Sequence, residues 1–284
     1  MPMINKNIKN VGTGFASFLS PPSPDVIRFT VGQPDFDTPS AIVDSAKAAL
    51  DRGETAYTRT QGSPDLCQSV SEHLSQYGIK IPAEDIVISP GCKQAVLYAM
   101  LATLDVGDEV ILLAPAWPSY DGMLKLLGAV PVHVPVRRDN YHPDFAAIET
   151  AITERTKAIM INSPNNPTGA VYTPDEVQRL VKIAEAHDLW IIDDMIYASL
   201  VWEDYGYTSP MTCEGGEERT ITIGGWSKGW AMTGWRMGWI GGSKEVIDAV
   251  KKVNASAATH IPTFLMPAGI TALSLEKETK MMQD

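Results

Sequence analysis

The chain has 284 residues, 44% of them hydrophobic and 20% charged, a composition typical of a globular protein with one large domain or two ordinary ones. Its net charge of -11 argues against nucleic acid or an anionic membrane as a partner, although it is compatible with a small anionic ligand. The N-terminal residues lack the apolar core of a signal peptide, and no apolar run reaches the about 20 residues of a membrane helix, so no membrane partner is expected. The three cysteines lie far apart without metal-binding spacing, which favours reduced thiols and a cytoplasmic protein.

Segments with the pattern of strands alternate along the chain with segments with the pattern of helices. A polar, proline-rich N-terminal arm comes first and leads into a short strand at 26–31. Thr38 or Ser40 is expected to cap the first helix of the body. Helices are then predicted at 40–50, 63–77, 95–104, 119–127, 143–151 and 173–187 and from 243 onward. Strands are predicted at 85–89, 109–113, 129–136, 158–162, 190–194, 221–224 and 235–240.

This alternation predicts an α/β fold of three layers, α/β/α, with a mostly parallel sheet covered by helices on both faces, because the strands are continuous apolar runs. Polar or aromatic side chains follow many of the strands. In an open α/β sheet the ligand crevice lies outside the carboxyl ends of the strands, so residues far apart in sequence are expected to converge there. These residues are Cys92, Lys93, Trp117, Asn166, Asp194 and Lys228.

One stretch, 224–239, holds a single lysine and a single arginine among Gly, Trp, Met, Ser, Thr and Ala. Burial among apolar residues lowers the pKa of a lysine and makes its neutral amine a nucleophile, so Lys228 is a candidate for bonding an aldehyde. Arg236 keeps its charge and suits a phosphate. An aldehyde and a phosphate on one small molecule suggest pyridoxal phosphate. A strand and turn with a lysine that only extends to solvent is the alternative.

Four motifs occur in order along the chain: Ser-Pro-Asn-Asn-Pro-Thr-Gly at 163–169, Asp-Met-Ile-Tyr at 194–197, Ser-Lys at 227–228 and Met-Thr-Gly-Trp-Arg at 232–236. This set resembles the signature of the class I/II aminotransferases, pyridoxal-phosphate enzymes of fold type I. The resemblance implies a pyridoxal 5'-phosphate cofactor and transfer of an amino group between an L-amino acid and a 2-oxo acid in two ping-pong halves. It also implies a homodimer with shared active sites.

The resemblance assigns the chemical roles at the ring. Lys228 would form the Schiff base and carry the proton between substrate and cofactor. Asp194 would pair with the pyridine nitrogen; it is preferred to Asp193 because Tyr197 follows three residues later, as in the family. Tyr197 and Asn166 would hydrogen-bond the phenolate oxygen, and the peptide bond after Asn166 is cis in the family.

The resemblance also assigns residues around the ring and the phosphate. Trp117 would stack on the ring, with a core tryptophan as the alternative. Tyr57 would reach the phosphate of the partner subunit's cofactor, with an ordinary loop aromatic as the alternative. Gly32, together with Asn166, would contact the substrate, with a plain turn glycine as the alternative. The phosphate itself would be held by backbone N–H groups of Gly91, Cys92 and Lys93 and by the guanidinium of Arg236.

The chain departs from the family in two places. Many relatives carry a hydroxyl residue three positions before the lysine, where this chain has Gly225. Family members also continue by roughly a hundred residues into a small C-terminal domain with a second arginine for the substrate α-carboxylate, and no arginine here matches it. The expected organisation is therefore an arm and substrate-closing segment at 1–38, a cofactor-binding domain at 39–266, and the start of a connecting helix at 267–284.

Other functions remain compatible with these motifs. A cofactor-binding fragment or partner protein without turnover, and a lyase of the same fold, would both keep Lys228. A nucleotide-binding α/β protein using Gly91 and 224–225 is the alternative from a different class. It is disfavoured because no G-x-G-x-x-G follows a strand and no P-loop is present.

Overall fold

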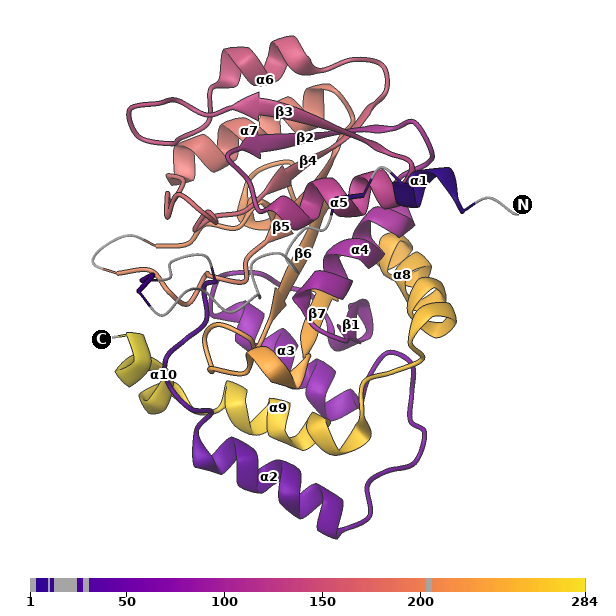
Figure 1. Cartoon of the computed structure of the whole chain (residues 1–284), viewed down its shortest axis with the longest axis vertical. Helices are drawn as coiled ribbons and strands as arrows, with labels where there is room; N and C mark the ends of the chain where they lie inside the picture. The colour runs from indigo at the N-terminus through magenta and orange to yellow at the C-terminus, as the bar shows by residue number, and fades with distance from the viewer. Residues whose placement is uncertain (1–3, 10, 13–24, 28–30, 203–205, 284) are drawn as a thin grey trace.

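A seven-stranded sheet runs through the centre of the computed structural model, which describes residues 4–9, 11–12, 25–27, 31–202 and 206–283 (Figure 1). Its strand order is β1-β7-β6-β5-β4-β2-β3. The strands are β1 (Ile86–Ser89), β2 (Glu109–Ala114), β3 (Val130–Pro135), β4 (Thr156–Ile161), β5 (Trp190–Asp194), β6 (Thr220–Gly225) and β7 (Gly238–Gly241). Strand β7 is antiparallel to both of its neighbours, and the other pairs are parallel. The predicted mostly parallel α/β sheet is confirmed.

Helices cover the sheet on both faces because alternate residues of each strand point to opposite sides. Ile192 of β5 packs in the same apolar cluster as residues of α4, α5 and α8, whereas its neighbour Ile191 packs in a cluster with residues of α6 and α7. The longer helices are α2 (Ser40–Asp51), α3 (Pro64–Ser75), α4 (Cys92–Thr103), α5 (Pro118–Leu127), α7 (Pro174–Ala186) and α8 (Lys244–Ala257). The shorter ones are α1 (Lys6–Lys9), α6 (Phe145–Ala151), α9 (Met266–Leu273) and α10 (Glu276–Gln283).

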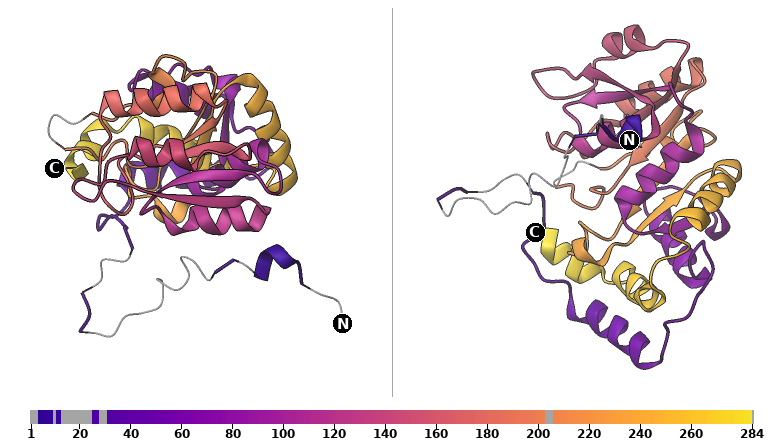
Figure 2. Two further views of the ribbon diagram at one scale, coloured as in Figure 1. Left: turned by 90° about the horizontal axis from the view of Figure 1, so that it is seen from above. Right: turned by 45° about the vertical axis from the view of Figure 1, so that its right-hand side comes forward.

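Helices α2, α3 and α9 build the end of the molecule below the edge strand β1. Figures 1 and 2 show α2 at this end beside α9, and the two helices contact each other. Ile42 of α2, Leu66 of α3 and Ala268 of α9 share one buried cluster. The predicted domain boundary at 266 thus falls at the start of a helix that packs into the body. No helix in the described ranges is long and apolar enough to cross a membrane.

Local structure differs from the sequence prediction at three places. Neither Thr38 nor Ser40 caps α2, whose N-cap is Pro39 without a side-chain hydrogen bond. Helix α4 begins at Cys92, three residues earlier than expected, because Gly91 takes φ 94° and turns the chain directly into the helix. The strand expected at 235–240 begins only at Gly238. Of the short strand predicted at 26–31, residues 28–30 lie outside the described residues, and Val26, Ile27 and Val31 are not part of a strand.

Candidate active site

A pocket of about 1490 Å³ opens at the carboxyl ends of the parallel strands. It is lined by nine of the eleven residues that the sequence singled out: Gly32, Cys92, Lys93, Trp117, Asn166, Asp194, Tyr197, Lys228 and Arg236. Gly91 lies just behind it, against Arg236. Tyr57 does not line this pocket; its side chain is 90% exposed and its ring meets that of His260 edge-on at 5.7 Å.

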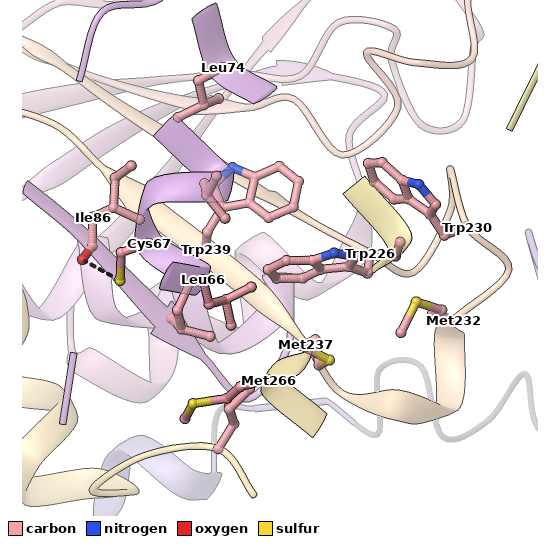
Figure 3. Packing of buried hydrophobic residues seen from close by; sticks show 14 of the residues in the cluster. Leu66, Cys67, Leu74, Ile86, Trp226, Trp230, Met232, Met237, Trp239 and Met266 are labelled. Carbon is pink, nitrogen blue, oxygen red and sulfur yellow. Dashed lines mark hydrogen bonds between the residues drawn. The ribbon is translucent and has the colours of Figure 1, made fainter. Parts of the chain in front are cut away.

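Lys228 sits in a loop that is anchored in the core on both sides. Figure 3 shows the rings of Trp226 and Trp239 together at the centre of the buried cluster, with Met237 beside them. The two rings meet edge-on at 4.8 Å, and Trp226 Nε1 donates a hydrogen bond to the carbonyl of Gly269 at 3.0 Å. The tryptophans and methionines of the 224–239 stretch therefore fix the loop so that Lys228 projects from a rigid base.

The amine of Lys228 faces the pocket interior. Its Nζ donates a hydrogen bond to the carbonyl oxygen of Gly32 and lies 5.9 Å from the centroid of the Tyr197 ring. Burial lowers the pKa of Lys228, and the positive charge of Arg236 acts in the same direction, although Cys92 and Asp194 oppose it. The local environment thus favours the neutral amine that a nucleophile and proton carrier needs.

Asp194 ends β5 with its carboxylate directed into the site and only 2% exposed. Its Oδ2 accepts a hydrogen bond from the hydroxyl of Tyr120 at 2.6 Å, and its Oδ1 accepts from the Ile196 amide at 3.2 Å and the Cys92 thiol at 3.5 Å. Its backbone carbonyl accepts from Asn162 Nδ2 at 2.9 Å. Burial raises the pKa of Asp194, and the hydrogen bonds from Tyr120, Ile196 and Cys92 counter that rise.

Asp193, the alternative to Asp194 as the carboxylate for a ring nitrogen, points to the other face of the sheet. Its Oδ2 accepts hydrogen bonds from the hydroxyls of Tyr207 at 2.5 Å and Ser209 at 3.0 Å. It is not among the residues that line the pocket. The position of the two side chains therefore favours Asp194 as the carboxylate that faces a ligand.

Asn166 and Tyr197 meet at the pocket wall. Asn166 Nδ2 donates to the Tyr197 hydroxyl at 3.1 Å, and the Asn166 backbone N–H donates to Asn162 Oδ1 at 2.8 Å. The Asn166-Pro167 peptide bond is cis, as the resemblance implies. Burial raises the pKa of Tyr197 to about 12, and the charge of Asp194 contributes. The Tyr197 hydroxyl therefore keeps its proton as a hydrogen-bond donor.

The start of α4 and the guanidinium of Arg236 lie together at the pocket. A β-carbon on Gly91 would lie 2.4 Å from Arg236 Nη2, so glycine is what lets the guanidinium lie against the helix start. Arg236 itself takes φ 54° and donates from Nη1 to the carbonyl of Thr233 at 2.9 Å. Lys93, in the first turn of α4, places its Nζ 4.9 Å from the centroid of the Trp117 ring. Burial, and then the charge of Arg236, lower the pKa of Lys93.

Close packing explains why position 225 is a glycine, although many relatives carry a hydroxyl residue there. A β-carbon there would lie 2.9 Å from the carbonyl oxygen of Met237 and 3.4 Å from Cys92 Cβ. Gly238 is tighter still, since its β-carbon would lie 2.4 Å from the backbone nitrogen of Cys92. The ends of β6 and β7 thus press against the start of α4, which leaves no room for a hydroxyl side chain at position 225.

Two residues of the site escaped sequence reasoning. Tyr120 lies three residues after Trp117, one turn into α5, and its ring meets that of Trp117 edge-on at 5.2 Å. The spacing of three residues on a helix places Tyr120 on the same side as Trp117, and this was the signal in the sequence that could have identified it. Asn162 follows β4 and supports both Asp194 and the Asn166 loop, so its place directly after a strand was a further signal.

The model of the family "Aminotransferase class I and II" matches residues 24–284. The chain belongs to this family. It is 40% identical over 252 residues to a probable aspartate/prephenate aminotransferase of Thermus aquaticus, covering 88% of this chain and 65% of the relative. It is 37% identical over 258 residues to the aspartate/prephenate aminotransferase of Thermus thermophilus, covering 90% and 66%.

Solved structures of aminotransferases share the fold closely. An aspartate aminotransferase from Thermus thermophilus with maleate superposes with a TM-score of 0.93 at 34% identity, covering 100% of this chain and 77% of that one. An aromatic aminotransferase from Pyrococcus horikoshii superposes with a TM-score of 0.85 at 35% identity, covering 89% and 68%. The chain spans about two thirds of the length of the curated aminotransferases it matches, 65% and 66% for the two from Thermus.

Pyridoxal 5'-phosphate is the cofactor of this aminotransferase family, and the donor set here fits it. The pocket holds an amine of lowered pKa at Lys228 and a buried carboxylate at Asp194 for a ring nitrogen. It also holds the Asn166–Tyr197 pair for a phenolic oxygen. Arg236 beside a helix N-terminus supplies charge and N–H groups for a phosphate.

Proposed function

We propose that this protein is a pyridoxal-phosphate-dependent aminotransferase that moves an amino group between an L-amino acid and a 2-oxo acid by a ping-pong mechanism. The observation that carries the proposal is that the Lys228 amine and the Asp194 carboxylate line one pocket although 33 residues separate them. The cofactor, when bound, supplies an electron sink for removal of the substrate α-proton. The named relatives support the same reaction.

Each residue of the pocket has its own role in the proposed reaction. Lys228 bonds the cofactor through its neutral amine and then holds and returns the substrate proton. Asp194 favours a protonated ring nitrogen, because a carboxylate beside that nitrogen stabilises its positive charge. Asn166 and Tyr197 hydrogen-bond the phenolic oxygen. Trp117 covers the ring, and Gly32 borders the substrate space.

For the substrate we propose an amino acid with an acidic side chain. The relatives are named for aspartate and prephenate, and Lys93 brings a positive charge into the pocket next to Trp117. Lys93→Met is expected to lower kcat/KM for aspartate by roughly 10- to 100-fold, the value of one charge-assisted contact. The same substitution is expected to leave kcat/KM for alanine nearly unchanged. An equal loss for both substrates would contradict the assignment.

We further propose a homodimer with shared active sites, in the cytoplasm. The 90% exposure of Tyr57, away from its own pocket, supports a role in a partner's site, and the three free thiols support a reducing compartment. Complementation between two inactive variants tests whether the two subunits share their active sites. A Lys228→Ala chain and a Tyr57→Ala chain are each expected to bind pyridoxal phosphate poorly. Mixed dimers then regain tight binding at the sites that combine intact Lys228 with intact Tyr57. Absence of any recovery in verified mixed dimers would refute shared sites.

The reaction is tested on the purified chain. Pyridoxal phosphate is added, and the absorbance that the cofactor gains on bonding an amine is recorded for the wild type and for Lys228→Ala, which is expected to lack it. Release of a 2-oxo acid is then measured with a panel of amino acids. An unchanged spectrum in Lys228→Ala would overturn the assignment. Binding without 2-oxo acid release would favour a cofactor-binding protein without turnover, and release of other products would favour a lyase.

A further inference from the structure

The side chain of Cys92 reaches from the start of α4 to the carboxylate that ends β5. Its Sγ donates a hydrogen bond to Asp194 Oδ1 at 3.5 Å, although 102 positions separate the two residues in sequence. The sequence predicts a role for Cys92 only through its backbone N–H group. The thiol is therefore a contact of the candidate site to which neither the motifs nor the resemblance assigns a role.

Close packing holds Cys92 in place. Helix α4 lies against β6 and β7 (Figure 1). A β-carbon on Gly238 would lie 2.4 Å from the backbone nitrogen of Cys92, and one on Gly225 would lie 3.4 Å from Cys92 Cβ. Cys92 as a whole is only 8% exposed. Two glycines, at the end of β6 and the start of β7, thus let Cys92 approach the sheet closely, and this approach brings its sulfur to Asp194.

The two carboxylate oxygens of Asp194 receive different numbers of donors. Oδ1 accepts from the Cys92 thiol and from the Ile196 amide, whereas Oδ2 accepts only from the Tyr120 hydroxyl among the described residues. Each oxygen of a carboxylate has about two lone pairs for hydrogen bonds. Both acceptor positions of Oδ1 are therefore occupied, and Oδ2 can still accept from the N–H of a ring nitrogen.

The thiol of Cys92 keeps its proton in these surroundings. Burial raises the pKa of Cys92 well above its ordinary value, and the nearby Asp194 carboxylate acts in the same direction, although the charges of Lys228 and Arg236 oppose it. Because an ionised carboxylate only accepts hydrogen bonds, the thiol is the donor in this contact. The hydrogen bond in turn counters the rise that burial causes in the pKa of Asp194.

We propose that Cys92 is a positioning residue of the cofactor site, whose thiol holds Asp194 Oδ1 and leaves Oδ2 to meet the ring nitrogen. The proposal rests on the proposed function, because it concerns the carboxylate that would serve the cofactor ring. In the proposed site the backbone N–H of Cys92 serves the phosphate, and its side chain acts through Asp194 on the ring. One residue at the start of α4 thus fixes the spacing between the two ends of the site.

Infrared absorption of the S–H bond tests the contact without any cofactor. A thiol that donates to a carboxylate absorbs at lower frequency than one that donates to a neutral carbonyl, because the charged acceptor weakens the S–H bond more. Cys67 and Cys213 are internal references, because their thiols meet backbone carbonyls at 3.7 Å. The band of lowest frequency is expected to vanish in Cys92→Ala and to move to higher frequency in Asp194→Asn. A Cys92 band that Asp194→Asn leaves in place would refute the hydrogen bond.

The affinity for pyridoxal phosphate tests the positioning. Cys92→Ala is expected to weaken binding by about three- to tenfold, the value of one hydrogen bond. Cys92→Ser is expected to keep part of the lost affinity, because its hydroxyl still donates, although the shorter bond to carbon leaves a longer gap to Oδ1. Cys67→Ala, at a buried thiol of α3 outside the pocket, is the matched control and should bind like the wild type. No loss in Cys92→Ala, or equal losses in Cys92→Ala and Cys92→Ser, would show that the donor is irrelevant.

The pH dependence of binding separates positioning from packing. Asp194 must be ionised to hold a protonated ring nitrogen, so affinity is lost as the pH falls through the pKa of Asp194. Removal of the thiol donor raises that pKa, so the acid loss of affinity is expected to begin at higher pH in Cys92→Ala and to stay in place in Cys67→Ala. The other titratable groups around Asp194 are unchanged in both variants: Asp193 on the same strand, Tyr120 of α5, Tyr197 and Lys228.

Two kinds of failure remain distinguishable. If the acid loss stays in place in Cys92→Ala although the affinity falls, the thiol contributes only packing and the proposal is wrong. If the wild type does not bind the cofactor, the proposed function is rejected instead, because the infrared bands of the cofactor-free protein still decide whether Cys92 donates to Asp194.

Discussion

The guanidinium of Arg236 lies directly against the α-carbon of Gly91, where a β-carbon would come within 2.4 Å of Nη2. Gly91 also takes φ 94° at the N-cap of α4. The contact therefore depends on glycine for two reasons, the left-handed backbone and the missing side chain. It brings a permanent positive charge to the N–H groups of a helix start, the two features that bind a phosphate.

Gly91→Ala is expected to weaken binding of pyridoxal phosphate by roughly 10- to 100-fold, because the new methyl group displaces the guanidinium from its charge-assisted contacts. Gly107→Ala is the matched control. Gly107 has the same φ of 94°, but a β-carbon there meets nothing within 4 Å. Both variants lose about 1 kcal/mol or more of stability from backbone strain. Equal cofactor affinity in the two variants would show that the Arg236 contact is irrelevant to binding.

The hydroxyl of Tyr120 donates to Asp194 at 2.6 Å and helps to keep that buried carboxyl ionised. Tyr120→Phe removes a donor to the charged form, so the pKa of Asp194 is expected to rise further. A less ionised Asp194 holds a ring nitrogen less well, and we expect cofactor affinity to fall by roughly tenfold, in line with about 1.5 kcal/mol for a hydrogen bond to a charged group. Tyr98→Phe, a buried tyrosine of the same cluster outside the pocket, is the control and should bind the cofactor normally. Titration of each variant with pyridoxal phosphate, followed by the absorbance of the bound cofactor, measures the affinity in Tyr120→Phe and in Tyr98→Phe.

The residues that follow strands were predictable from sequence, because strand ends in a parallel sheet meet at one edge. Asn166, Asp194 and Lys228 illustrate this, since each follows or ends a strand and all three line one pocket. Tyr120 was not predictable in the same way. It lies on a helix 74 residues from Asp194, and only the tertiary structure brings the two together.

Position 225 shows a second limit of sequence reasoning. The family resemblance leads one to expect a hydroxyl residue where this chain has Gly225, and the structure shows that a side chain has no space there, since the strand end packs against Met237 and Cys92. The start of α4 at Cys92, three residues before the predicted start, also depends on a local backbone feature that the sequence does not show. Pro-Gly before Cys92 predicts a turn, and only the backbone angle of Gly91 shows that the turn continues directly into α4.

His73 is buried between the rings of Tyr77, Trp230 and Trp239, at centroid distances of 5.5, 5.4 and 5.6 Å. Burial lowers the pKa of His73 to about 4. The unfolded chain therefore binds the proton more readily, and stability is lost as the pH falls from about 6.5 toward 4. The loss amounts to roughly 3 kcal/mol at the acid end. His73→Phe is expected to abolish this part of the acid sensitivity, while the exposed His187→Phe is not. Urea unfolding at pH 7 and pH 4.5 measures the difference, and parallel acid losses in His73→Phe and wild type would contradict the assignment.

Thr38 connects the segment before α2 to the loop that follows Lys228. Its hydroxyl donates to the carbonyl of Ala231 at 2.7 Å and accepts from Trp235 Nε1 at 3.1 Å. This use of the hydroxyl explains why Thr38 does not cap α2. Thr38→Val has nearly the same shape but leaves both partners without their hydrogen bonds, so a cost of about 1 to 3 kcal/mol in the free energy of unfolding is expected.

Ser40→Ala is the control for Thr38→Val. Ser40 is exposed at the start of α2 and makes no capping hydrogen bond, so its replacement is expected to change the stability by less than about 0.5 kcal/mol. Gly32 lies between the arm and Thr38 and accepts a hydrogen bond from Lys228. Loss of the Thr38 anchor is therefore also expected to loosen the segment around Gly32 and to raise KM for the amino acid more than it lowers kcat. A larger stability loss in Ser40→Ala than in Thr38→Val would mean that the hydroxyl near the helix start acts as a cap after all.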